Sequence, residues 1–349
     1  MIESLFLPLS LFLLVAVFAG WLTGCVRRHA IRSGMLDHPK ARSSHTLPTP
    51  RGGGLAIAVV VIAGTIVLHL AGLLGTRPAL ALGPGTAAVM LIGWLEDRRG
   101  LPAAIRAIAY LVASAGALWL LGGVPSIDLG FTRIPLGMAG NLCVLFGLAW
   151  MINLYNFMDG TDGLAATQAL AAAVFGGLLF FLNGAPGEAW LCLVLAAACA
   201  GFLRWNRPPA KIFMGDTGSC TLGFILGVLA VIGENNGAAP VLAWLILLAL
   251  FVCDATLTLL RRVISGEKWY IAHRSHAYQL LVRAGLSHGR LALYLLTIDV
   301  FALGPLAVYV TLNREFLLPG AVTAVAGAAL LWIAVQTRLA RRIAAGVKE

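Results

Sequence analysis

The run LAATQALAAAVFGGLLFFLN, at positions 164–183, contains no charged side chain. A helix of about 20 apolar residues is long enough to span the hydrocarbon core of a bilayer. Similar runs recur along the whole chain of 349 residues, which is 60% hydrophobic and 11% charged and has a mean hydropathy of +0.89. A water-soluble domain of this size could not cover so much apolar surface with polar side chains. The sequence therefore predicts an all-α, polytopic integral membrane protein.

The hydropathy pattern predicts about 11 transmembrane helices. They cover roughly residues 4–25, 53–75, 79–95, 101–122, 136–155, 164–183, 187–203, 217–234, 238–260, 290–312 and 318–337. The first run has no basic residue before it and is followed by Arg27 and Arg28, which favours a retained helix over a cleaved signal peptide. No linker-like segment interrupts the pattern, so we expect a single membrane-embedded domain over residues 1–349.

The basic residues test this count. With the N-terminus periplasmic and the C-terminus cytoplasmic, 22 of the 25 Lys and Arg fall on the cytoplasmic side, and only Arg77, Arg133 and Arg314 fall outside. This asymmetry follows the positive-inside rule and supports both the helix count and the orientation. It also accounts for the net charge of +10 without nucleic-acid binding. The six cysteines form no CxxC pair, so neither disulfides nor a zinc site is indicated.

Acidic residues gather at the predicted cytoplasmic helix ends. The loops expected on this face cover residues 26–52, 96–100, 156–163, 204–216 and 261–289. In the first acidic motif, GWLEDRRG at 93–100, the adjacent carboxylates of Glu96 and Asp97 repel each other, and a divalent cation relieves that repulsion. The alternative is a solvated turn that only ends two helices.

The second motif, NLYNFMDGTDG at 153–163, combines amides and carboxylates. Asn153 and Asn156 are spaced to share one helix face, and Asp159 and Asp162 repeat that spacing in a glycine-containing turn. These oxygen ligands suit magnesium and phosphate-bound water. A structural cap for the following helix is the alternative reading.

The third motif, FMGDTGS at 213–219, opens a predicted helix with Asp216, which is either a site residue or an ordinary N-cap. Arg51, in RGGG at 51–54, precedes another helix that begins on the same face. Helix N-termini present unpaired N–H groups and favour phosphate. Together with arginines and Mg²⁺, they predict a diphosphate site of the kind used in phosphoryl transfer.

Further candidates lie in the second long loop. His273, Arg274 and His276 could bind phosphate or shuttle a proton, although histidines in a basic loop are often only solvated. Asp254 and Asp299 fall within predicted helices, where a charge is usually paired. Either acid lines a polar groove or belongs to a buried structural pair.

Together these motifs resemble the polyprenyl-phosphate N-acetylhexosamine-1-phosphate transferases. The matching residues span most of the chain, in the family's order: Glu96-Asp97, Asn153-x-x-Asn156-x-x-Asp159-Gly-x-Asp162-Gly, Asn206 through Phe213-Met-Gly-Asp216-x-Gly-Ser219, and His273-x-x-His276. The stretch from Asp37 to Gly54 resembles the O-antigen-initiating branch.

The resemblance implies a function. It implies transfer of a sugar-1-phosphate from a UDP-amino sugar to undecaprenyl phosphate, a membrane lipid, with release of UMP. It also implies a location in the bacterial inner membrane, a role in cell-envelope polysaccharide synthesis, and a homodimer. The cofactor it implies is Mg²⁺, with Mn²⁺ as an alternative.

The resemblance also assigns roles to individual residues. It implies that Asp216 and Asp97 bind the metal. The other catalytic residues it implies are Glu96, Asp159, Asp162, His273 and His276. Of the substrate-binding residues, it implies Asn156, Asn206 and Phe213 around the nucleotide. We expect Arg51, Arg106, Asn153 and Arg274, at the same face, to bind substrate as well, with Arg106 and Arg274 holding the diphosphate oxygens.

Two departures from the family pattern stand out. The paired-acid motif is commonly Asp-Asp but here is Glu96-Asp97, which puts a base role for Glu96 in doubt. The histidine motif is not the triple histidine of the peptidoglycan branch, so a muramyl-pentapeptide donor is disfavoured. The donor sugar is otherwise not specified by the sequence.

Two other classes of protein, transporters and CDP-alcohol phosphotransferases, share some features of this sequence. A transporter would explain the many spans and the acids within them. Transporters, however, usually place polar residues near the midplane and often show inverted repeats. In this sequence the acidic motifs gather at one face, and no such repeat is evident. A CDP-alcohol phosphotransferase shares the start of its motif with Asp162-Gly163, but Thr167 stands where an arginine is required.

Overall fold

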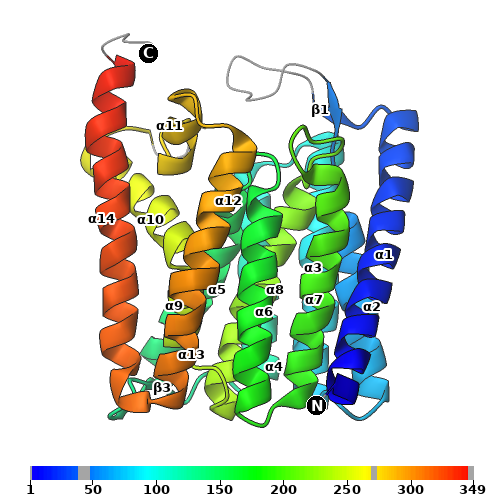
Figure 1. Cartoon of the computed structure of the whole chain (residues 1–349), viewed down its shortest axis with the longest axis vertical. Helices are drawn as coiled ribbons and strands as arrows, with labels where there is room; N and C mark the ends of the chain where they lie inside the picture. The colour runs from blue at the N-terminus through cyan, green and yellow to red at the C-terminus, as the bar shows by residue number, and fades with distance from the viewer. Residues whose placement is uncertain (1, 38–47, 269–272, 345–349) are drawn as a thin grey trace.

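The computed structural model describes residues 2–37, 48–268 and 273–344 and shows an α-helical bundle (Figure 1). The helices are α1 (Ile2–Arg32), α2 (Leu55–Leu70), α3 (Thr76–Arg99), α4 (Ala103–Leu120), α5 (Gly137–Phe157), α6 (Leu164–Leu182), α7 (Pro186–Asn206), α8 (Asp216–Asn236), α9 (Val241–Leu247), α10 (Ala249–Ile264), α11 (Ala277–Arg283), α12 (His288–Ile298), α13 (Gly304–Leu312) and α14 (Leu317–Ala344). A π-helical turn, η1 (Asp299–Leu303), joins α12 to α13, and a 3₁₀ turn, η2 (Arg314–Phe316), precedes α14.

Two short antiparallel strand pairs lie at opposite ends of the bundle (Figure 1). β1 (Leu36–Asp37) pairs with β2 (Thr49–Pro50), and β3 (Ser126–Asp128) pairs with β4 (Arg133–Pro135). We call the two ends of the bundle the β1 end and the β3 end. The chain begins near the β3 end and finishes at the β1 end, so the termini lie on opposite sides of the bundle.

The predicted membrane architecture is confirmed, with a correction to the number of spans. All eleven predicted segments are helical, and nine helices in the described residues are long and apolar enough to cross a bilayer. The predicted helix 238–260 is broken: α9 and α10 meet at 82°, and count as a tenth span only when taken together. The predicted helix 53–75 is shorter than a span, because α2 has 16 residues.

Several predicted loops are partly helical. The paired acids belong to the last turn of α3, which ends at Gly100 (φ 69°), rather than to a loop at 96–100. Arg98 and Arg99 favour this extension, since basic side chains stabilise a helix C-terminus. The loops expected at 26–52, 204–216 and 261–289 are likewise shortened by the ends of α1, α7 and α10 and by α11.

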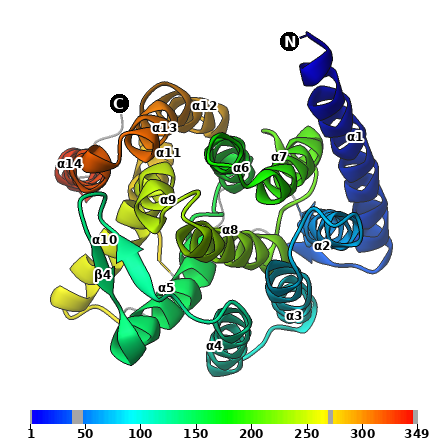
Figure 2. The same ribbon diagram turned by 90° about the horizontal axis from the view of Figure 1, so that it is seen from below.

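α8 stands at the centre of the bundle, with α3, α4, α5, α6 and α9 around it (Figure 2). All but one of residues 217–234 are buried, whereas outer helices such as α1 and α4 expose large apolar side chains, as lipid-facing helices do. Because α8 begins at the β1 end, its N-terminus lies among the acidic motifs. Arg77, Arg133 and Arg314 lie at the β3 end, on α3, β4 and η2.

Candidate active site

A side chain from another helix caps the N-terminus of α8. The carboxylate of Asp97, in the last turn of α3, accepts hydrogen bonds from the backbone N–H groups of Asp216 (3.1 Å) and Thr217 (3.0 Å). It also accepts one from the Thr217 hydroxyl at 2.6 Å. The first N–H groups of a helix lack partners within the helix, so a carboxylate here satisfies them and interacts favourably with the helix dipole. Asp97 is only 3% exposed and fixes where α8 begins.

Close backbone contacts make this cap possible. A Cβ atom on Gly93 of α3 would lie 2.5 Å from a carbonyl oxygen of α8, and one on Gly54 would overlap the backbone of Gly218. Gly215, just before α8, has a φ of 73°, and a Cβ atom there would overlap the Asp97 carboxylate. Glycine therefore allows α2, α3 and α8 to approach closely enough for Asp97 to reach α8.

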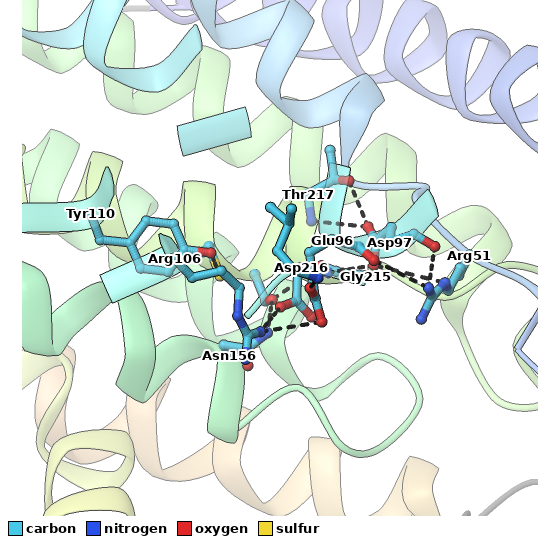
Figure 3. Close-up of polar contacts among 12 residues, drawn as sticks. Arg51, Glu96, Asp97, Arg106, Tyr110, Asn156, Gly215, Asp216 and Thr217 are labelled. Carbon is cyan, nitrogen blue, oxygen red and sulfur yellow. Dashed lines mark hydrogen bonds and ion pairs between the residues drawn. The ribbon is translucent and has the colours of Figure 1, made fainter. Parts of the chain in front are cut away.

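Arg51 joins the chain before α2 to the end of α3. Its guanidinium donates to the carbonyl oxygens of Asp97 and of Glu96 (3.5 Å), and its Nε lies 4.0 Å from Oδ1 of Asp97. The Phe213 N–H donates to the Pro50 carbonyl at 2.8 Å, which holds this chain beside the segment that leads into α8. The RGGG motif at 51–54 and the FMGDTGS motif at 213–219 are therefore brought together at the α8 N-terminus, where Figure 3 shows Arg51 and Asp216.

Arg106, from the first turn of α4, is shared by two acids. Its guanidinium lies 2.9 Å from Oδ2 of Asp216 and 3.5 Å from Oε1 of Glu96 (Figure 3). Glu96 also accepts a hydrogen bond from the Leu101 N–H through its other oxygen. The two adjacent acids of the motif thus have different partners: Asp97 faces α8, and Glu96 faces α4.

Asn156 approaches the same cluster from the last turn of α5. Its amide donates to the Ser219 hydroxyl at 3.0 Å and also contacts the Asp216 carboxylate. Asn153, one turn earlier, donates to the Ala149 carbonyl of its own helix at 2.8 Å. The structure therefore brings Asn156 to the cluster, whereas the described Asn153 amide hydrogen bond is to its own helix.

Asp159 follows α5, and its carboxylate has no hydrogen bond or ion pair with any described residue, although its backbone N–H donates to the Asn156 carbonyl at 3.2 Å. Burial raises the pKa of its carboxyl well above the usual range, and the nearby acids Asp216, Asp97 and Asp162 raise it further. An unpaired carboxylate facing like charges is a natural place for a cation. It is the strongest electrostatic argument for a metal here.

Asp162 lies in a neighbouring group of contacts. Its Oδ2 accepts a hydrogen bond from the Ala210 N–H at 3.0 Å and lies 3.4 Å from Nδ1 of His288, at the start of α12. Asp162 therefore holds the loop between α7 and α8 against the turn before α6. No periodic or motif signal pointed to His288, because its partner lies 126 residues away.

Asn206, at the end of α7, acts on the same loop. Its Oδ1 accepts a hydrogen bond from the Gly163 N–H, and its Nδ2 donates to the Ile212 carbonyl, both at 2.9 Å. The side chain is 3% exposed, so both ends of the amide are used within the protein. Phe213, which follows this loop, remains partly exposed.

The His273–His276 segment stands beside the turn that carries Asp159. Nδ1 of His273 lies 2.9 Å from the Ser275 hydroxyl, and the two imidazole rings are 4.9 Å apart between centroids. Burial lowers the pKa of His273 to about 4, helped by His276 and by Arg262, so His273 is neutral at neutral pH. Arg274 is partly buried within the segment.

The Tyr278 side chain fastens this segment to the Asp159 turn. Its hydroxyl donates to the Phe157 carbonyl at 2.9 Å, and its ring lies 5.8 Å from that of His276. Tyr278 was not singled out from the sequence, although it stands two residues after His276. Thr217 was also missed, although it lies inside the quoted FMGDTGS motif, and Ser219, one of the matching residues of that motif, was given no role.

Among the described residues, protein side chains alone do not form a complete metal site. Within residues 2–37, 48–268 and 273–344, no three His, Cys, Asp or Glu side chains lie close enough together to hold a metal ion. Mg²⁺, however, is usually held by one or two carboxylates together with waters and substrate phosphates. Asp159 and Asp216, two acids close enough to influence each other's charge, fit that kind of site.

The buried acids inside the helices have different surroundings. Asp254 pairs with the start of α11, as one of its two sequence-based interpretations predicted. Asp299, on η1, is 3% exposed, and neither of its carboxylate oxygens has a hydrogen-bond partner among the described residues. Of the stretch from Asp37 to Gly54, residues 38–47 lie outside the described residues, and so do Lys40, Arg42 and Lys348 of the charge count.

Comparison with known proteins agrees with these motifs. The sequence model of the family described as "Glycosyl transferase family 4" matches residues 79–234. The chain is 32% identical to the probable undecaprenyl-phosphate N-acetylglucosaminyl 1-phosphate transferase of Bacillus subtilis, over 76% of this chain and 75% of that protein. It is also 32% identical to the decaprenyl-phosphate N-acetylglucosaminephosphotransferase of Mycolicibacterium smegmatis, over 97% and 90%.

A more distant branch is also similar. The phospho-N-acetylmuramoyl-pentapeptide-transferase of a Picosynechococcus species is 31% identical over 67% of each chain. The names of the first two relatives include a polyprenyl phosphate, and the range matched by the family model includes Glu96, Asp97, Asp159 and Asp216. The chain belongs to glycosyl transferase family 4, among the polyprenyl-phosphate N-acetylhexosamine-1-phosphate transferases.

Proposed function

We propose that this protein transfers the 1-phosphate of an N-acetylated amino sugar from a UDP-sugar to undecaprenyl phosphate. An oxygen of the lipid phosphate forms a bond to the phosphorus that carries the sugar. The bond from that phosphorus to the bridging oxygen breaks, and UMP leaves with that oxygen. The named relatives act on undecaprenyl or decaprenyl phosphate and on N-acetylglucosamine, which supports both substrate classes.

One observation carries the proposal: Arg106 and Asp216 form an ion pair at the N-terminus of α8, beside the unpaired Asp159. Positive groups held at a helix N-terminus bind phosphate, and acids around them hold the charge-neutralising cation that a diphosphate needs. Phosphoryl transfer depends mainly on such positioning and charge neutralisation. A phosphate monoester already carries most of its second charge at pH 7, so the acceptor needs no strong base.

We assign the cation as Mg²⁺, with Mn²⁺ able to replace it. Asp216 and Asp159 would hold it together with the donor's phosphates. The bound ion would neutralise charge on the diphosphate. Asp97 has hydrogen bonds on both carboxylate oxygens, so its proposed task is to hold Asp216 in place.

The remaining predicted residues receive supporting roles in this proposal. Arg51 and Glu96 stabilise the end of α3, while Asp162 and Asn206 shape the loop before Phe213. Phe213 is partly exposed, and its proposed role is to stack on uracil. We further propose that the β1 end faces the cytoplasm of a bacterial inner membrane, because nearly all basic residues of the sequence belong to that side. The lipid-linked sugar would begin a cell-envelope polysaccharide, such as O-antigen.

The test is release of UMP by the detergent-purified protein with undecaprenyl phosphate, Mg²⁺ and a panel of UDP-amino sugars. We expect release that requires both the lipid and the metal, with one preferred sugar. Asp216→Asn should abolish turnover and weaken Mn²⁺ binding measured by electron paramagnetic resonance. Glu188→Gln, which replaces an acid at the β3 end, is the matched control and should keep both turnover and Mn²⁺ binding.

The outcomes separate the parts of the proposal. If folded wild-type protein releases no UMP with any donor in the panel, the proposed reaction is wrong. If release occurs but persists in EDTA, the assignment of the metal is wrong and the reaction stands.

A further inference from the structure

A second buried carboxylate caps a helix at the same end of the bundle. Asp254, on α10, accepts hydrogen bonds from the N–H groups of Ala277 (2.8 Å) and Tyr278 (3.0 Å), the first two residues of α11. Its Oδ1 also lies 3.6 Å from Nδ1 of His276. Asp254 is 7% exposed and His276 is 3% exposed. The contact between Asp254 and the end of the His273–His276 segment is therefore buried inside the protein.

We propose that Asp254 is a positioning residue for the His273–His276 segment, and this inference rests on the proposed transferase function. Asp254 does not touch the reacting groups in this proposal. It fixes the position and orientation of the start of α11. The histidine segment leads directly into α11 and lies beside the turn that contains Asp159.

A carboxylate is needed because α11 has seven residues. So short a helix is not stable in isolation, and its first N–H groups have no partners within the helix. A carboxylate supplies two acceptor oxygens, and Asp254 uses one for each of the first two N–H groups. The arrangement repeats that of Asp97 at the start of α8.

A hydrogen-bond relay orients the Asp254 carboxylate. The indole N–H of Trp332, on α14, donates to the Thr258 hydroxyl at 2.9 Å, and that hydroxyl donates to Oδ1 of Asp254 at 3.2 Å. Gln336, one turn further along α14, donates to the Ser275 carbonyl at 2.8 Å. α10 and α14 therefore hold the histidine segment from two sides.

α11 is in turn coupled to the site. Besides donating to Phe157, the Tyr278 hydroxyl lies so close to Gly160 that a Cβ atom there would overlap it. The ring of His276 lies 6.2 Å from that of Phe157. A shift of α11 would therefore move both the histidines and the turn that carries Asp159.

The experiment compares two threonines on α10. Thr258→Val breaks the relay from Trp332 to Asp254. Thr256→Val is the matched control, because Thr256 accepts a hydrogen bond from the indole of Trp150, at 3.0 Å, without contacting the histidine segment. Asp254→Asn and Asp254→Glu are measured beside them, all as full-length protein.

Two measurements are made on each variant. The first is kcat and KM for the UDP-sugar, per folded enzyme. The second is hydrogen–deuterium exchange of residues 273–283, which does not depend on activity. A displacement of about 1 Å can lower a rate by about 100-fold, so we expect Asp254→Asn to lower kcat by at least about tenfold, with KM changed less than about threefold.

Exchange at 273–283 should rise in Asp254→Asn and in Thr258→Val, and Asp254→Glu should recover part of kcat. Thr256→Val should match wild type in both measurements. Unchanged kcat and exchange in folded Asp254→Asn would overturn the proposal, and so would equal effects of Thr258→Val and Thr256→Val. If the wild type itself lacks transferase activity while exchange responds as expected, the proposed function fails and the structural role of Asp254 stands.

Discussion

One oxygen of the Asp97 carboxylate, on α3, accepts hydrogen bonds from both the hydroxyl and the backbone N–H of Thr217, on α8. The two residues are 120 positions apart in the sequence. This contact joins the paired-acid motif to the Asp216 motif, and it separates the tasks of the two acids. Asp97 builds the helix start from which Asp216 projects, whereas Glu96 turns toward Arg106.

Replacing the Thr217 hydroxyl should weaken this joint. A hydrogen bond to a charged group contributes about 1.5–3 kcal/mol, so we predict that Thr217→Val lowers the free energy of unfolding by that order and reduces turnover. The measurement is thermal unfolding in detergent together with UMP release. Thr221→Val is the control, because among the residues that the structure describes the Thr221 hydroxyl bonds only to the Thr217 carbonyl, within α8. Equal losses in the two variants would contradict a special role for the Asp97 contact.

Arg106 bridges Glu96 and Asp216, and we expect the shape of its guanidinium group, as well as its charge, to be required. We predict that Arg106→Lys lowers kcat/KM by at least about tenfold, because an ammonium group cannot reproduce the planar geometry of a guanidinium that serves two carboxylates. Steady-state kinetics with the preferred UDP-sugar would show this. Arg77→Lys, at the β3 end, should leave the kinetics unchanged. Wild-type kinetics in Arg106→Lys would show that only its charge is required.

Asp159 opposes folding and supports function in our proposal. Because it faces like charges without a partner, Asp159→Asn should raise the unfolding temperature in EDTA while removing most turnover. Mg²⁺ should then stabilise the wild type more than the variant. Thermal unfolding with and without Mg²⁺ tests this directly, and an equal Mg²⁺ effect on both proteins would argue against Asp159 as a ligand.

The His273 pKa of about 4, below the usual 6.5, predicts a specific dependence of stability on pH. Between these two values the unfolded chain binds a proton at this residue and the folded protein does not. Stability therefore falls as pH drops from about 6.5 toward 4, and is insensitive to His273 above about 7. Burial is the main cause of the lowered pKa, followed by the nearby His276 and Arg262.

His273→Gln cannot titrate and should lose less stability over this range. Unfolding temperatures measured from pH 4.5 to 8 would test the expectation. Parallel curves for the variant and the wild type below pH 6.5 would contradict a lowered pKa.

Asp299 offers a test outside the proposed site. The Gln168 side chain lies beside the Asp299 carboxylate. Even so, both carboxylate oxygens and Oε1 of Gln168 are without a hydrogen bond of normal geometry among the described residues. Asp299→Asn introduces a donor and removes a buried acid, so we predict a gain of about 1 kcal/mol in the free energy of unfolding, with turnover unchanged. Thermal unfolding and UMP release are the measurements, and a loss of stability would show that the carboxyl group has a partner of its own.

Much of the fold was accessible from the sequence. Predominantly apolar runs of membrane-spanning length predicted all eleven helical segments, because a bilayer requires both apolar side chains and internal backbone hydrogen bonding. The same reasoning missed the 82° break between α9 and α10, since the residues around Leu248 are as apolar as those of an unbroken span. It also placed Glu96 and Asp97 in a loop rather than in the last turn of α3.

The candidate site was only partly predictable. The structure brings Asp216, Asp97 and Asn156 together, as the chain order of the motifs predicts. Arg106, which belongs to none of these motifs and was expected only as an arginine of the same face, joins them. The backbone N–H groups that bond to Asp162, Asn206 and Asp254 were not foreseen, because a backbone group has no side-chain signature in the sequence. Sequence reasoning identifies chemical groups, and it does not show which of them are already used by the protein.

The sequence by itself determined that the chain is a helical membrane protein and which of its helix ends carry the chemistry, since both follow from side chains near one another along the chain. The tertiary structure decided how similar acids divide their tasks. Asp97 and Asp254 cap helices, Asp216 pairs with Arg106, and the carboxylate of Asp159 has no hydrogen-bond or ion-pair partner among the described residues. The environment of a carboxylate depends on groups tens to more than a hundred residues away, and only packing of the helices brings those groups within hydrogen-bonding distance.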